Sequence, residues 1–329
     1  MHYRKFGNTD LLVSEIGFGA WAIGGGAMIG NTSIGWGDAD DRTSEGAIQQ
    51  AIDTGINFFD TADVYGLGHS EDILGKTIGR NNNVIIATKV GNVARNEQFT
   101  TDYSKQHIIS ACEQSLRRLK RNSIDFYQLH SARINQLREG ECIEAMTYLQ
   151  RQGKVRYWGL SLNTFDPVPE ADYLMSNKLG NGFQLVLNIL NQKALPVLRK
   201  ATEAGYGIIA RMPLQFGLLT GKFNESSVFA FNDHRNKRLT KDIIASTLQL
   251  LQPVWKLCDK FHITRTQLAL SYILSYPGVS TVIPGIRTKE HVIDNTSGLI
   301  RLPDEERQSI ERYGKTDLLP LLDLIQKQG

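Results

Sequence analysis

Cysteine is scarce in this chain, and long apolar runs are missing from it. Only three of its 329 residues are cysteines, Cys112, Cys142 and Cys258, and no Cys-x-x-Cys pair occurs. An odd number of widely spaced cysteines argues against a disulfide framework or a zinc site, and it favours buried thiols. No run of 18 apolar residues occurs, and the amino-terminal MHYRKFGNTD lacks the apolar segment of a signal peptide. We therefore expect a cytoplasmic protein without a membrane partner or a bound metal.

An excess of one charge sign is also missing. The chain has 37 Lys and Arg residues against 34 Asp and Glu residues, a formal net charge of +3. Nearly balanced signs do not predict a nucleic acid partner, although an anionic small molecule is compatible with them. Arg117, Arg118, Lys120 and Arg121 form a local basic cluster. We interpret it as a solvated helix face whose aliphatic stems pack inward.

Two glycine patterns resemble nucleotide-binding motifs, but each lacks a required part. The stretch Ile16 to Ala22 has the glycine spacing of a dinucleotide fingerprint, which requires a helix directly after the glycines. Here Ile23-Gly24-Gly25-Gly26 and a loop out to Gly37 follow instead. The phosphate-binding P-loop pattern fails at Gly75-Lys76-Thr77, where Ser70 replaces the first glycine, and Gly217 to Lys222 is one residue short. Neither a Rossmann nor a P-loop fold is predicted.

Short apolar runs typical of strands alternate with stretches typical of helices. Strands are expected at 56–60, 84–88, 124–129, 155–160, 183–187, 206–210 and 279–283, the last counted as the eighth. Helices are expected at 42–54, 70–79, 104–120, 138–152, 166–176, 195–204, 240–260, 264–276 and 303–314. This alternation favours one α/β domain over residues 1–329, a (β/α)8 barrel, rather than a doubly wound sheet. The segments Tyr3–Phe6 and Leu11–Val13 predict an amino-terminal hairpin, and extra helices lie before and after strand eight.

Ionisable side chains stand where several of these strands end. Asp60 closes an apolar strand and Tyr65 follows on the next loop, while Lys89 and His130 come directly after two further strands. The residues after strands five to eight, Ser161 with Asn163, Asn188, Arg211 and Pro284-Gly285, continue this polar ring. Because ligands bind at the carboxyl ends of parallel barrel strands, we expect these groups to meet at one face.

The segments that carry these groups are similar to those of a known enzyme family. Asp60 and Tyr65 in DTADVYG, Lys89 in IIATKVG and His130 in DFYQLH resemble the tetrad of the aldo-keto reductases. The resemblance runs from about Tyr3 to Asn295 and includes GFGAW, RYWGLS, PLQFGLLTGK and VIPGIRTKEHVIDN. It implies an oxidoreductase in which a nicotinamide gives a hydride to a small-molecule aldehyde or ketone. Tyr65 would protonate the developing alkoxide, Lys89 and Asp60 would tune Tyr65, and His130 would orient the carbonyl.

The resemblance also implies a set of cofactor-binding residues. Gly19 and Trp21 would lie near the nicotinamide, Ser161, Asn163 and Gln184 would hold its carboxamide, and Gly217, Leu218 and Lys222 would follow the pyrophosphate. Arg211, in ARMPL with Pro213, takes the place of a tyrosine that usually stacks on the nicotinamide. The stretch after Gly285, with Arg287, Lys289, His291, Asp294 and Asn295, would bind the adenosine end and its 2′-phosphate, so NADPH (NADP⁺) is favoured. The family usually has Ser followed directly by Asn, whereas Leu162 intervenes here.

Two other functions remain open at this point. Barrels of this family also serve as auxiliary channel subunits that bind the cofactor with little turnover, because a fold does not fix a function. An unrelated barrel lyase or aldolase could use Lys89 as a Schiff-base nucleophile, which would require a neutral Lys89. Substrate preference is expected from the loop Gly24 to Gly37, the loop after Phe223 and the tail Lys315 to Gly329.

Overall fold

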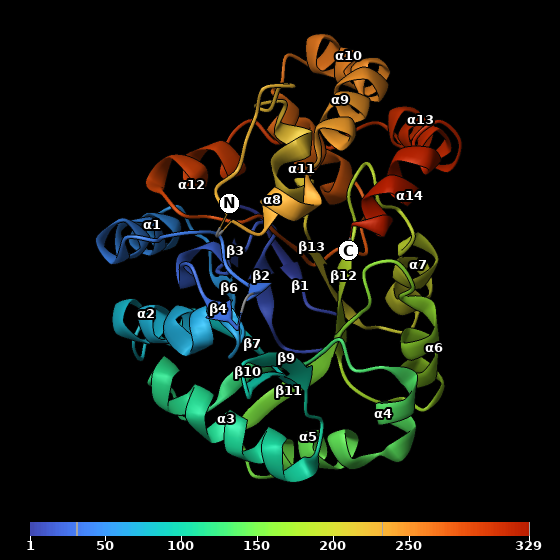
Figure 1. Cartoon of the computed structure of the whole chain (residues 1–329). Coiled ribbons are helices and arrows are strands. Elements are labelled where there is room, and N and C mark those ends of the chain that lie inside the picture. The colour runs from blue at the N-terminus through green and yellow to red at the C-terminus, as the bar shows by residue number, and fades with distance from the viewer. Residues whose placement is uncertain (31, 232, 329) are drawn as a thin grey trace.

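The barrel predicted from the sequence is present in the computed structural model, which describes residues 1–30, 32–231 and 233–328. Eight parallel strands lie in the order β14-β13-β12-β11-β10-β7-β6-β3. Helices surround them (Figure 1). The strands are β3 Phe18–Gly19, β6 Phe58–Asp60, β7 Ile85–Val90, β10 Ile124–His130, β11 Val155–Ser161, β12 Gly182–Val186, β13 Gly207–Arg211 and β14 Thr281–Ile283. The first of them lies within the glycine-rich stretch Ile16 to Ala22.

Backbone contacts between the first and last strands close the sheet into a barrel. The amide of Gly17 donates to the carbonyl of Val282 at 2.8 Å, and that of Gly19 donates to Pro284 at 3.0 Å. Parallel bridges pair Ile16 with Val282 and Gly19 with Gly285. Closure leaves the main sheet without an unpaired edge and brings the carboxyl ends of all eight strands to one opening.

Most helices begin and end close to the predicted boundaries. Those of the barrel wall are α1 Asp41–Asp53, α2 His69–Thr77, α3 Lys105–Leu119, α4 Ile134–Glu139, α5 Glu141–Arg151, α6 Val168–Ser176, α7 Leu195–Glu203 and α11 Arg265–Leu274. The helix α12 Lys289–Thr296, which follows β14 and packs against α1 and α11, also belongs to the wall, and the extra helices are α8 Arg235–Arg238, α9 Lys241–Leu250, α10 Gln252–Phe261, α13 Asp304–Lys315 and α14 Leu319–Lys327. Three short 3-10 turns are η1 Ala22–Gly24, η2 Tyr65–Gly68 and η3 Gln215–Thr220.

Two predicted helices are each divided in the structure. The helix expected at 138–152 is α5, and a separate α4 precedes it because Gly140 has a left-handed backbone with φ of 85°. The helix expected at 240–260 is α9 followed by α10, and Pro253 lies in the first turn of α10. Proline has no amide hydrogen, so it suits a first turn and not a helix interior.

Three hairpins accompany the barrel, and only the first was predicted. They pair β1 Tyr3–Lys5 with β2 Leu12–Ser14, β4 Met28–Ile29 with β5 Thr32–Ser33, and β8 Asn92–Arg95 with β9 Gln98–Thr101. The first one closes the amino-terminal end of the barrel with Phe6, Leu11 and Val13, which join the barrel interior. A Cβ on Gly207 would come within 2.4 Å of the Phe6 ring, so β13 needs glycine there.

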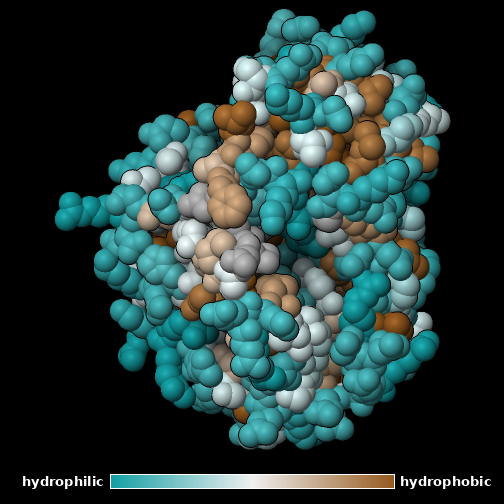
Figure 2. Space-filling view, in the orientation of Figure 1, coloured by the Kyte–Doolittle hydropathy of each residue, from teal (hydrophilic) through white to brown (hydrophobic). Residues whose placement is uncertain are grey.

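The face from which α8 and the β8–β9 hairpin rise is mostly hydrophilic (Figure 2). Apolar side chains gather on it in the region that α9, α10 and α14 occupy in Figure 1. Within the described ranges, no helix combines the length and the apolar character needed to cross a membrane.

Candidate active site

A buried ion pair lies at the carboxyl ends of two neighbouring strands. Asp60 is the last residue of β6 and Lys89 belongs to the adjacent β7. The ammonium of Lys89, which is 0% exposed, donates to the Asp60 carboxylate at 2.7 Å and to the carbonyl of Thr61 at 2.8 Å. Burial opposes the charged form, but Asp60 and then Tyr65 outweigh it and raise the pKa of Lys89. The site therefore contains a fixed cation at neutral pH.

Tyr65 is the third member of this group. Its hydroxyl lies 3.2 Å from the Lys89 ammonium, which donates to it. The turn η2 that carries Tyr65 passes close to η1, since a Cβ on Gly66 would approach the carbonyl oxygen of Gly24 to 2.1 Å. Glycine at 66, with φ of 61°, thus allows the contact that places Tyr65 at the opening.

His130 completes the predicted tetrad as the last residue of β10. Its ring is perpendicular to that of Tyr65, with centroids 6.0 Å apart. Burial, followed by the positive charges of Lys89 and Arg211, holds the pKa of His130 well below its usual range. The imidazole is therefore neutral at pH 7 and can donate only one hydrogen bond. The four residues, predicted from three strand ends and the loop after one of them, lie together.

Two glutamines hold the other oxygen of the Asp60 carboxylate. The side-chain amides of Gln184 and Gln128 donate to Oδ1 at 2.7 and 3.1 Å, whereas Lys89 binds Oδ2. The expected contact of Gln184 with a nicotinamide carboxamide stays a prediction, and its amide nitrogen is already engaged here. Gln128 was not predicted. It lies two residues before His130 on one strand, so the two-residue period of a strand could have identified it.

Arg211 is the last residue of β13 and faces the same opening. Its guanidinium donates to the carbonyl of Leu162 and to the hydroxyl of Thr164, both at 3.1 Å. Burial lowers the pKa of Arg211, and the nearby Tyr65 and Asp60 oppose this effect. Within the described ranges no carboxylate forms an ion pair with Arg211, so its charge is not neutralised by direct contact.

Ser161 and Asn163 differ in their surroundings. Ser161 is the last residue of β11 and is buried. The side-chain oxygen of Asn163 instead accepts the backbone amides of Phe165 and Asp166 at 3.1 and 3.0 Å. This turn occupies the acceptor of Asn163, so the structure connects Asn163 with the loop that leads to α6.

The residues predicted for the phosphates lie on two elements that approach each other. Gly217 and the buried Leu218 belong to η3, which Pro213 precedes and Lys222 follows. Lys289, His291, Asp294 and the buried Asn295 belong to α12, after the open position Gly285. Burial, then the charge of Lys222, lowers the pKa of His291, so Lys222 lies near enough to act on this imidazole.

Arg287 has a partner that the sequence did not predict. Its guanidinium donates to the carbonyls of Trp36 and Asp38 at 3.3 and 2.5 Å. It therefore fixes the end of the loop Gly24 to Gly37, the glycine-rich loop, to the start of α12. Its proposed contact with a 2′-phosphate stays a prediction.

An aromatic cluster borders Tyr65. Trp21 lies parallel to Tyr65 with a centroid distance of 5.9 Å, and His234 lies 4.7 Å from Trp21 and from Phe216 and 5.1 Å from Trp36. Only Trp21 was predicted. Trp36 and His234 come from loops and Phe216 from the short turn η3, none of which has a periodic pattern, so no sequence signal placed them together.

The fold and this group of side chains define an oxidoreductase of the (β/α)8 barrel class. The chain belongs to the aldo/keto reductase family, because the sequence model of that family matches residues 15–315. It is 33% identical to the aldo-keto reductase YhdN of Bacillus subtilis over 87% of this chain and 85% of that protein. It is 27% identical to a probable voltage-gated potassium channel subunit beta of Arabidopsis thaliana, over 92% of each chain. The holo form of aldo-keto reductase AKR11C1 from Bacillus halodurans is similar in structure, with a TM-score of 0.75, 28% identity and coverage of 95% of this chain and 96% of that one.

Proposed function

We propose that this protein reduces an aldehyde or ketone to an alcohol with NADPH, and that Tyr65 is the proton donor. The observation that carries the proposal is the contact of 3.2 Å between the Tyr65 hydroxyl and the ammonium of Lys89, which Asp60 binds at 2.7 Å. An ordinary phenol, with a pKa of about 10, is a weak acid at pH 7. A buried cation beside it stabilises the phenolate that remains after the proton has left.

The residues around Tyr65 have distinct parts in this proposal. NADPH, when bound, supplies a hydride to the carbonyl carbon. Tyr65 gives its proton to the carbonyl oxygen, and Lys89 stabilises the resulting phenolate. Neutral His130 donates a hydrogen bond to the same oxygen and orients the substrate. Asp60 keeps Lys89 charged, which also argues against a Schiff-base lyase, since that reaction needs the free amine.

The residues present fit a nicotinamide dinucleotide with a 2′-phosphate. Two positively charged donors, Lys222 and Arg287, lie near the imidazole of His291. A third cation, Lys289, is the first residue of α12. In the proposal these residues, with Asp294 and Asn295 near the adenosine, bind the phosphate end. Gly217 and Leu218 follow the pyrophosphate, while Gly19, Trp21, Ser161, Asn163, Gln184, Arg211 and Pro213 surround the nicotinamide. The cytoplasmic location expected from the sequence is also part of the proposal.

A second candidate function is a cofactor-binding auxiliary subunit. The similarity to a probable potassium channel subunit beta favours it. The complete group of Asp60, Tyr65, Lys89 and His130 favours an enzyme. Oxidation of NADPH with a panel of aldehydes, ketones, sugars and steroids distinguishes the two, since a subunit with little turnover would reduce none of them.

The replacement Tyr65→Phe tests the proton donor. It removes the hydroxyl and keeps the ring, so carbonyl reduction should fall roughly 10²- to 10⁴-fold while the dissociation constant of NADPH changes little. NADPH absorbance follows turnover, and a fluorescence titration gives the affinity. Tyr148→Phe, at an exposed position of α5, is the matched control and should retain full activity. Full activity of Tyr65→Phe would refute the assignment.

A further inference from the structure

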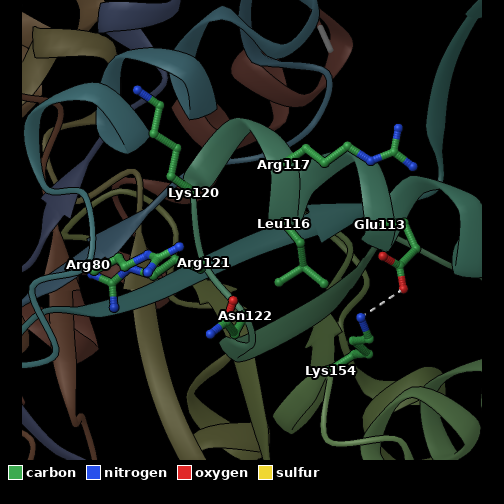
Figure 3. Close-up of a pocket in the computed structure, with 8 residues that line it drawn as sticks. All are labelled: Arg80, Glu113, Leu116, Arg117, Lys120, Arg121, Asn122 and Lys154. Atoms are coloured by element: carbon green, nitrogen blue, oxygen red, sulfur yellow. Dashed lines mark ion pairs between the residues drawn. The ribbon is translucent and has the colours of Figure 1, made fainter.

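A hollow at the opposite end of the barrel contains the basic cluster that the proposed function does not use. It has a volume of about 550 Å³ and is lined by Arg80, Glu113, Leu116, Arg117, Lys120, Arg121, Asn122 and Lys154 (Figure 3). Five cations and one carboxylate line it, an excess of four positive charges, whereas the whole chain has an excess of three. Positive charge is thus concentrated at one place on an otherwise balanced molecule.

The chain does not neutralise these cations as it neutralises others. The one carboxylate, Glu113, is bound to Lys154 at 3.3 Å. Arg80, Arg117, Lys120 and Arg121 form no ion pair with any described residue, in contrast to other cations of α2 and α3.

Other cations of α2 and α3 form ion pairs with glutamates of neighbouring helices. Lys105 and Arg118 of α3 bind Glu144 and Glu71 at 3.2 and 2.7 Å, and Lys76 of α2 binds Glu45 at 2.5 Å. The negative ends of the helix dipoles favour cations in the last turn, which accounts for Arg117. Arg80, Arg121 and Lys154 lie just beyond the last turns of α2, α3 and α5, where this effect weakens, and the guanidinium of Arg121 donates to the carbonyl of Asn81 at 2.7 Å.

The shape of the site limits what could occupy it. In Figure 3, Arg80 and Arg121 extend from one side, the Glu113–Lys154 pair lies on the other, and Leu116 and Asn122 lie between them. Arg117 and Lys120 project from the rim. The volume is within the range of small-molecule pockets. Arginine has a planar donor group that matches phosphate oxygens.

We propose that this hollow, the basic hollow, binds a small molecule that bears two or more phosphoryl groups. One doubly charged phosphate would leave half of the charge excess uncompensated. The site is separate from the reductase site, because it adjoins the beginning of β10 whereas His130 ends that strand, roughly 20 Å away at about 3.3 Å per residue. The proposal therefore does not depend on the proposed function.

Calorimetric titration with inorganic tripolyphosphate, in the presence of saturating NADPH, tests the basic hollow. We expect one binding site per chain, at least tenfold weaker affinity in the double variant Arg80→Gln with Lys120→Gln, and at least tenfold weaker binding of orthophosphate by the wild type. The matched control is Lys178→Gln. Lys178 is also exposed and has the same φ of 54° as Lys120, but it precedes β12 and is not part of the hollow.

Several results would overturn this assignment. The first is that tripolyphosphate does not bind. The second is that the double variant binds it as tightly as the wild type. The third is that Lys178→Gln loses as much affinity as the double variant. A single-stranded oligonucleotide of about 20 bases that binds more tightly than tripolyphosphate would indicate a polymer surface instead. Carbonyl reduction and NADPH affinity should be unchanged in the double variant, so the failure of either proposal can be recognised separately.

Discussion

At the scale of single residues, Arg211 adds a positive charge to the candidate active site. It lies near enough to His130 that its charge lowers the pKa of that residue, and it contacts a carbonyl and a hydroxyl rather than a carboxylate. Oxidised nicotinamide is cationic and the reduced ring is neutral. At about 4 Å in an effective dielectric of about 20 the repulsion would be ~4 kcal/mol, which water and salt should reduce to ~1 kcal/mol.

We therefore predict that Arg211→Tyr tightens NADP⁺ selectively, by about fivefold, while NADPH affinity stays nearly constant. Fluorescence titrations of both cofactors measure the ratio. Arg138→Tyr, which changes an exposed arginine of α4, should leave the ratio unaltered. If the ratio is also constant in Arg211→Tyr, the charge of Arg211 does not act on the nicotinamide.

At the scale of elements, the segment between η3 and α9 is fixed to the glycine-rich loop. The residue Asp233 forms a bridge with Trp36, and the amide of His234 donates to the carbonyl of Gly35 at 3.4 Å. Burial, then the charge of Arg238, lowers the pKa of His234 to about 3. An aromatic environment thus holds a neutral imidazole between two loops.

This arrangement predicts that the protein loses stability in mild acid. An unfolded His takes up a proton near pH 6.5, whereas folded His234 does so only near its pKa of about 3. Between these values the unfolded chain binds more protons, so the free energy of unfolding falls as the pH falls, by up to about 1.4 kcal/mol per pH unit for this group.

The variant His234→Phe should keep the packing and remove this contribution. Urea unfolding at pH 6.5, 5.5 and 4.5 should show a less steep loss of stability than in the wild type. The control is His262→Phe, at an exposed position after α10. An identical pH dependence in wild type and His234→Phe would show that His234 is protonated in the folded protein.

At the scale of the whole molecule, the amino-terminal hairpin and the barrel share one apolar interior. Phe6 is fully buried and meets Phe126 of β10 edge to face, with ring centroids 4.8 Å apart. We propose that residues 1–329 form a single domain in which this hairpin unfolds together with the barrel.

The variant Phe6→Ala should then reduce the free energy of unfolding by about 3–5 kcal/mol and keep a single transition. Urea unfolding followed by circular dichroism and by tryptophan fluorescence checks both points. Phe99→Ala, at an exposed position of β9, should change the stability by less than about 0.5 kcal/mol. Two separate transitions would contradict a single domain.

The sequence by itself determined the barrel and the group of four side chains proposed to react at its opening. Apolar runs that end in Asp60, Lys89 and His130 predict buried parallel strands, and the carboxyl ends of such strands meet at one opening. Local patterns suffice for this, because strand alternation and strand ends are properties of neighbouring residues. For the same reason Gln128 could have been found from its spacing to His130.

Only the tertiary structure decided which side chains share a partner across the barrel. The amide of Gln184 binds Asp60 over 124 positions of sequence, and Arg287 binds the carbonyls of Trp36 and Asp38 over about 250. Likewise His234 meets Trp21, and Arg80 joins Arg121 in the basic hollow. Loops have no periodicity that fixes their direction, and hydrogen bonds between distant groups depend on how the closed barrel brings those loops together. Sequence pattern therefore predicted the strand ends, and packing determined their partners.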